Sequence, residues 1–246
     1  MSEIVTAGIL VIGDEILSGR TKDKNIGFIA EYLTNIGIDL KEVRVVADDE
    51  PDIIAALDAL RTRYAYVFTT GGIGPTHDDI TADSVAKAFG VGIDHHPEVV
   101  ARFKERFKNP GELNEARLRM ARIPDGAELI QSATILAPGF KIGNVIVMAG
   151  VPSIMQAMMD IVAPTLKSGV RMLSETVRAN CREGDIGGPL REIATTHPDT
   201  MIGSYPFIDE NQKPNTNLVV RSRDPDKLNA AMAAVKEMLA QLHASH

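Results

Sequence analysis

The residues best suited to chemistry in this chain form a glycine-rich turn that ends in two aspartates. The turn reads Gly71-Gly72-Ile73-Gly74-Pro75-Thr76-His77-Asp78-Asp79. The β-branched and aromatic run 66–70 before it predicts a buried strand, and the apolar spacing in 80–89 after it predicts a helix. Glycines between a strand and a helix let backbone N–H groups approach a phosphate, and the helix N-terminus adds partial positive charge.

The two aspartates of this turn point beyond simple anion binding. Asp78 and Asp79 would repel a bare phosphate, so they suggest a bound divalent metal or direct participation in a reaction. The alternative is structural: one aspartate caps the following helix and the glycines form a tight turn. The turn alone leaves both interpretations open.

Two more acidic loops follow other predicted strands. Gly13-Asp14-Glu15 comes after the apolar run 7–12, and Asp48-Asp49 comes after the run 40–46. Carboxylate oxygens suit Mg²⁺, Mn²⁺ or Co²⁺, and Ser18 is placed to contact phosphate or ribose. As alternatives, Asp23 caps the next helix, and one residue of the Asp48-Asp49 pair caps the helix that begins near Pro51.

The order of elements predicts where these loops meet. Strands at 7–12, 40–46, 66–70 and 145–148 alternate with helices at 25–36, from 51, at 80–89 and from 152 to about 166. This alternation is typical of a parallel α/β sheet, which binds ligands at the carboxyl ends of its strands. We therefore expect the three acidic or glycine-bearing loops at one edge. Such a set suits metal-assisted phosphoryl chemistry better than a serine triad, because no serine lies on a nucleophile elbow.

The pattern changes after Lys167-Ser168-Gly169, which predicts domains 1–168 and 169–246. Strands at 176–179, 201–205 and 217–221 with helices at 186–195 and 225–242 indicate a small α+β domain, with Pro206 and Pro214 flanking its hairpin connection. Two further helices, at 97–108 and 112–122, interrupt the first domain and are candidates for a lid or an oligomer contact.

Composition limits the classes of partner. The 246 residues carry a net charge of −7, which argues against a broad nucleic-acid surface, and contain one cysteine, which excludes an internal disulfide framework. No apolar run is long enough to span a membrane, and the N-terminus has no basic leader. We expect a cytoplasmic protein whose ligand is a small molecule.

The motifs resemble those of the molybdopterin-binding (MoaB/Mog-like) domain family. The similar stretches are 7–17, Asp48 and 70–81, and the match is closest to the competence/damage-inducible protein A branch and the N-terminal domain of eukaryotic FAD synthases. The resemblance implies a Rossmann-like, mostly parallel sheet and a homo-oligomer. It also places the family's two acidic positions on Asp48 and Asp79. The stretch 132–139 departs from that branch's usual pattern.

The resemblance and the residues together lead to one hypothesis and two alternatives. The hypothesis is a metal-dependent pyrophosphatase that cleaves ADP-ribose, FAD or a related dinucleotide. One alternative is pterin binding or adenylyl transfer in molybdenum cofactor biosynthesis, and the other is a non-catalytic nucleotide sensor. The predicted catalytic residues are Asp48 and Asp79, and the predicted metal ligands are Asp14, Glu15, Asp48 and Asp79. The predicted ligand-contacting residues are Gly13, Ser18, Thr70, Gly71, Gly72, Gly74, Pro75, Thr76, His77, Asp78 and Thr81.

Overall fold

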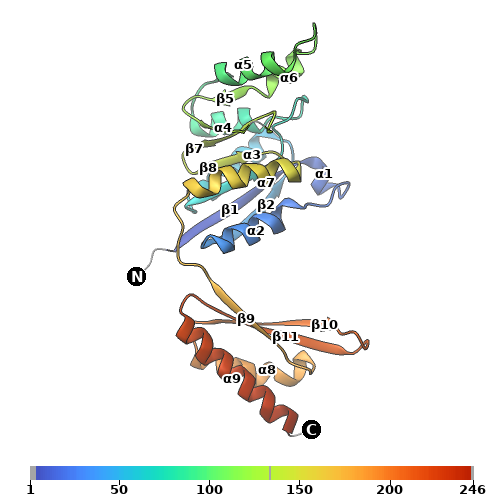
Figure 1. The fold of residues 1–246 in the computed structure, drawn as a ribbon, viewed down its shortest axis with the longest axis vertical. Helices are drawn as coiled ribbons and strands as arrows, with labels where there is room; N and C mark the ends of the chain where they lie inside the picture. The colour runs from blue at the N-terminus through green and yellow to red at the C-terminus, as the bar shows by residue number, and fades with distance from the viewer. Residues whose placement is uncertain (1–3, 133, 245–246) are drawn as a thin grey trace. The chain divides into compact units, whose positions relative to one another are not determined.

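The computed structural model describes residues 4–132 and 134–244. The chain divides into two compact units, Met1–Gly169 and Val170–His246, which are described separately (Figure 1).

The first unit is built on a six-stranded, mostly parallel sheet, as predicted. Its strand order is β2-β1-β3-β8-β7-β6. Four strands run parallel: β1 (Val5–Ile12), β2 (Ile38–Val46), β3 (Tyr66–Thr70) and β8 (Val145–Met148). The short strands β7 (Gly139–Ile142) and β6 (Glu128–Ile130) extend the sheet in antiparallel fashion and were not predicted.

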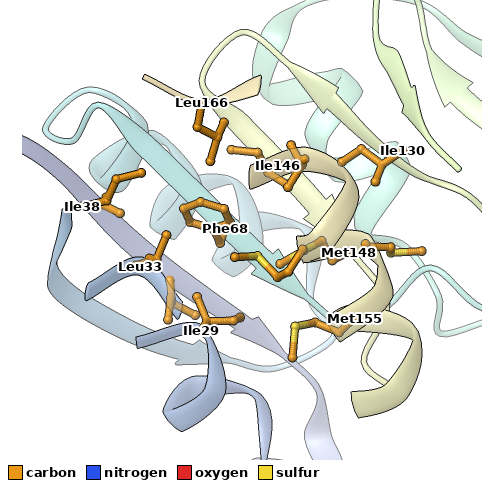
Figure 2. Packing of buried hydrophobic residues seen from close by; sticks show 14 of the residues in the cluster. Ile29, Leu33, Ile38, Phe68, Ile130, Ile146, Met148, Met155 and Leu166 are labelled. Atoms are coloured by element: carbon orange, nitrogen blue, oxygen red, sulfur yellow. The ribbon is translucent and has the colours of Figure 1, made fainter. Parts of the chain in front are cut away.

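Helices cover both faces of this sheet because its strands are apolar on both sides. Along β1, Ile9 and Val11 pack into one core cluster, whereas Leu10 and Ile12 pack into the other. The first cluster includes residues of α2 (Asn25–Asn35) and α7 (Pro152–Val162), among them the buried Met155 (Figure 2). The second cluster includes residues of α3 (Glu50–Arg61) and α4 (Thr81–Phe89).

The excursion before β6 differs from the prediction of two helices. Helix α5 (Pro97–Arg106) is present, but α6 spans only Glu115–Arg119. Gly111 has a positive φ of 78°, and Asn114 caps α6 by accepting the Arg117 N–H at 3.0 Å, so the helix begins later than expected. Residues Arg122–Pro124 form strand β5, which pairs antiparallel with β4 (Ile93–His95), because the residue before a proline favours extended backbone.

The second unit is a small α+β domain, as predicted. Its antiparallel sheet has the order β10-β11-β9. The strands are β9 (Leu173–Arg178), β10 (Met201–Ile208) and β11 (Pro214–Ser222), and the helices are α8 (Glu183–Thr196) and α9 (Pro225–Ala244). Leu218 and Val220 of β11 pack with both helices in one core cluster. Pro206 lies inside β10 rather than beside the hairpin loop, which an edge strand tolerates.

Two short helical segments complete the described chain, α1 (Asp14–Leu17) and the 3₁₀ turn Ala163–Thr165. Among the helices of residues 4–132 and 134–244, none combines the length and apolar character that crossing a membrane requires.

Candidate active site

The parallel strands bring the predicted loops to one edge of the sheet. In the strand register Ile12 lies opposite Val46, and Thr70 lies between Val11 and Met148. The residues that follow are therefore neighbours. Backbone hydrogen bonds join the loops: Gly13 N donates to the Val46 carbonyl at 3.1 Å, and Gly71 N donates to the Met148 carbonyl at 3.3 Å.

Asp48 is the carboxylate at this edge whose ionised form is disfavoured by burial and by neighbouring negative charges. It is half-buried, and its Oδ2 accepts the Asp14 N–H at 3.0 Å. Burial raises the pKa of Asp48 above its usual value, and repulsion from Asp14, Glu15 and Asp78 raises it further, while the Asp14 N–H opposes the shift. Four acidic side chains from three loops therefore interact electrostatically at this edge.

Gly71 and Gly72 are required by the close packing of the turn, whether or not a ligand binds. Gly71 has a φ of 103°, and a Cβ there would collide with the Ile12 carbonyl oxygen. At Gly72 a Cβ would collide with the Thr81 hydroxyl. Thr81 is fully buried, and its hydroxyl donates to the Gly71 carbonyl at 3.0 Å while its N–H donates to the Gly72 carbonyl at 3.0 Å. Thr81 thus holds the turn through its hydroxyl and its backbone N–H.

Asp79 stabilises the second half of the turn and does not cap helix α4. Its Oδ2 accepts the Thr76 N–H at 2.8 Å and the Thr76 hydroxyl at 2.5 Å, and its carboxylate lies against Gly74. The α4 N-cap position belongs to Ile80, which makes no side-chain cap. Next to it, the pKa of Asp78 is lowered by the neighbouring Thr76 side chain and by its own backbone, and His77 and Arg119 lower it further. The side chain of His77 is almost fully exposed.

Of the predicted metal ligands, Asp14 and Glu15 are neighbours of Asp48, whereas Asp79 is engaged with Thr76. In the part of the chain that the structure describes, no three His, Cys, Asp or Glu side chains are arranged to hold a metal. Asp14, Glu15 and Asp48 are the side chains of this edge that could contribute to a site for a Mg²⁺-type ion, which takes only one or two carboxylates from a protein and completes its shell with waters and ligand phosphates.

Two aspartates act structurally, as the alternative interpretations stated. Asp49 caps α3 by accepting the Asp52 N–H at 3.2 Å. Asp23 accepts the N–H groups of Asn25 and Ile26 at 3.1 and 2.8 Å, at the start of α2. The Ser18 hydroxyl is exposed and lies 3.4 Å from the Glu15 carbonyl.

The structure adds basic residues that the sequence did not place near the turn. Arg119 Nε donates to the Asp79 carbonyl at 3.1 Å, and Arg122 pairs with Asp83 at 2.6 Å. Together with Gly72 and Gly74, these residues line a small cleft on the α4 side of the turn. No sequence signal links them, because forty residues separate Arg119 from Asp79 and only the fold of the excursion brings them together.

Comparison with known proteins decides the family. Residues 8–168 match the model described as "Probable molybdopterin binding domain", and residues 171–245 match "FAD synthase, middle domain". The chain belongs to the family of molybdopterin binding domains. The resemblance to MoaB/Mog-like domains and to FAD synthases is thereby confirmed.

Relatives of this family cover the chain to different extents. A "Probable FAD synthase" of Caenorhabditis elegans is 31% identical over 265 residues, covering 98% of this chain but only 51% of the relative. A protein of Archaeoglobus fulgidus is 32% identical over 232 residues, covering 94% of this chain and 96% of its own length. The solved structure of the protein CinA with unknown function from Thermoplasma acidophilum has a TM-score of 0.61 and 31% identity, and the match covers 66% of this chain and 98% of that one.

Proposed function

We propose that the α/β unit cleaves the diphosphate of an adenylated ligand such as ADP-ribose or FAD with the help of a divalent cation. The observation that carries the proposal is Asp48, a half-buried carboxylate surrounded by other acids beside a glycine turn. The resemblance of the second unit to a FAD synthase domain supports a flavin or adenylated ligand.

Asp48 is the general base in this proposal. Its raised pKa makes it a stronger base than an ordinary aspartate, and the hydrogen bond from Asp14 N–H holds its orientation. One carboxylate oxygen accepts that bond, and in this proposal the other takes a proton from water. Asp79 acts by holding Thr76 and the turn in position.

The excess of acids explains why a cation is required. A diphosphate entering beside Asp14, Glu15 and Asp48 would be repelled by their charges. A divalent ion held by Asp14, Glu15 and the ligand's phosphates would neutralise this charge and lower the pKa of a water, leaving Asp48 free to act as the base. The backbone N–H groups of Gly72 and Gly74 would then contact the phosphates, since the N–H groups of Gly71 and Thr81 already donate within the turn.

The test follows AMP release. The protein is incubated with ADP-ribose or FAD and with Mg²⁺, Mn²⁺ or Co²⁺, and AMP is measured by chromatography. We expect AMP only when a metal is present, and its loss on adding a chelator. We also expect Asp48→Asn to lower kcat by at least about a hundredfold, as for removal of a general base, with the protein still folded. AMP release that is independent of metal, or full activity in Asp48→Asn, would contradict the mechanism.

The family match favours a second candidate, molybdopterin binding with adenylyl transfer. In this case incubation with molybdopterin, ATP and Mg²⁺ yields adenylated pterin, while ADP-ribose and FAD stay intact. Binding of AMP or pterin without any product in either assay would instead favour a nucleotide sensor.

A further inference from the structure

A second cleft lies on the α2 side of the glycine turn and contains buried polar atoms without partners. It has a volume of about 210 Å³ and is lined by the ends of β1 and β3 and the start of α2. Asn25 and Thr70 line it and are only 5% and 1% exposed. Within the described residues, Asn25 Oδ1 and Thr70 Oγ1 are buried and have no hydrogen-bond partner. Such atoms cost free energy unless a water or a bound ligand satisfies them.

The hydrogen bonds already present decide what these atoms require. Asn25 Nδ2 donates to the Gly150 carbonyl at 2.9 Å, which fixes the amide and leaves Oδ1 as an acceptor. The Thr70 hydroxyl can donate or accept. The missing partner must therefore offer an N–H or O–H donor. An ionised phosphate offers acceptors only, so the phosphate end of a ligand does not fit here.

The walls and the size of the cleft indicate one ring. Ile16 and Pro152 contribute apolar surface, and Lys22 and Lys24 lie at its exposed rim. Ligand pockets for a whole drug-sized molecule occupy roughly 300–1,000 Å³, so a cleft of about 210 Å³ holds part of a ligand. A cleft that combines apolar side chains such as Ile16 and Pro152 with buried polar atoms suits a planar heterocycle, which has apolar faces and polar edges.

We propose that this cleft binds the heterocyclic end of the ligand, a purine or pterin ring with an N–H donor, and that Asn25 and Thr70 determine its specificity. The ring's N–H bonds Asn25 Oδ1, and Thr70 Oγ1 bonds an adjacent polar atom of the ring. The phosphates then lie over Gly71 toward Asp48. The choice of ligand rests on the function proposed above, whereas the location of the ring rests on the unpartnered atoms.

The test uses a matched pair of valine substitutions. Thr70→Val removes the unpartnered hydroxyl in the cleft, and Thr69→Val removes a neighbouring hydroxyl that is also buried and unpartnered but does not line the cleft. Neither change should lower the melting temperature, because replacing an unpaired buried hydroxyl by an isosteric methyl is nearly neutral. Binding of AMP, of a phosphate-free pterin and of inorganic pyrophosphate is measured by calorimetry for each variant.

We expect Thr70→Val to weaken binding of AMP or of the pterin about threefold to tenfold, the value of one hydrogen bond, and to leave pyrophosphate binding unchanged. Thr69→Val should change none of the affinities. Whichever ring compound binds the wild type identifies the ring. The proposal is overturned if neither ring compound binds, if Thr70→Val has no effect on ring binding, or if it weakens pyrophosphate equally. If AMP is not released but Thr70→Val still weakens ring binding, the proposed reaction is wrong and the proposed ring-binding cleft stands.

Discussion

At the scale of single residues, the acidic pairs divide their roles between structure and chemistry. Asp49 caps α3, while its neighbour Asp48 points into a crowded group of carboxylates. Asp79 holds Thr76, while Asp78 remains largely exposed. Asp49 and Asp79 each stabilise a local turn by accepting a backbone N–H three residues away. Asp48 instead lies among other acidic side chains, so it is the carboxylate of these pairs that we expect to bind a cation or a proton.

The raised pKa of Asp48 predicts a gain of stability on neutralisation. Because its pKa in the folded state lies above the unfolded value, its protonated form stabilises the fold at acidic pH, and this contribution is lost as pH rises through the raised pKa. Asp48→Asn should therefore raise the melting temperature at pH 7.5, since asparagine can still accept the Asp14 N–H.

The advantage of this variant should shrink as pH falls toward the ordinary aspartate pKa of about 4. Thermal unfolding of wild type and Asp48→Asn across this range is the measurement. Asp49→Asn serves as a control for loss of a neighbouring charge. If the melting temperatures of wild type and Asp48→Asn differed by the same amount at all pH values, the charge of Asp48 would not destabilise the fold.

At the scale of elements, the turn requires glycines because the ends of β1, β3 and β8 and the start of α4 leave no room for side chains. Gly71 approaches the Ile12 carbonyl, and Gly150 approaches Gly71. Thr81 closes the turn from the first residue of α4. The backbone of the turn is thus held in place before any ligand arrives, which lowers the cost of ordering it on binding.

Substitution of two glycines separates backbone strain from crowding. Gly71→Ala adds a collision with the Ile12 carbonyl to a φ of 103°, whereas Gly19→Ala meets only the left-handed φ of 72° with open space around it. We expect a loss of about 1 kcal/mol in the free energy of unfolding for Gly19→Ala and at least about 3 kcal/mol for Gly71→Ala. Urea unfolding measures both, and equal losses would show that the turn can shift to make room.

At the scale of the whole molecule, each unit contains its own apolar core. The core of the second unit joins β11 with α8 and α9 and includes Met232 and Val235, both buried. A core of this kind allows independent folding even in a unit of this small size.

A fragment of residues 170–246 should therefore unfold cooperatively when heated, as measured by far-ultraviolet circular dichroism. Val235→Asp should abolish this transition, because it buries an unpaired charge. Ala233→Asp, on the exposed side of α9, should leave the transition in place. A fragment without a cooperative transition would mean that the second unit depends on the first.

The sequence by itself determined the order of the four parallel strands with their helices and the edge at which the loops gather. Apolar runs and their periods report local structure, and parallel strands must carry their following loops to the same edge. The glycine turn, the small second domain and the alternative capping roles of Asp23 and Asp49 were therefore all accessible from residue patterns.

Only the tertiary structure decided which polar groups are buried, paired or crowded. It placed Asp78 near Asp48, engaged Asp79 with Thr76, and brought Arg119 to the turn across forty residues. It also left Asn25 and Thr70 buried without partners. These outcomes depend on contacts between elements distant in sequence, and desolvation and charge repulsion act through space rather than along the chain.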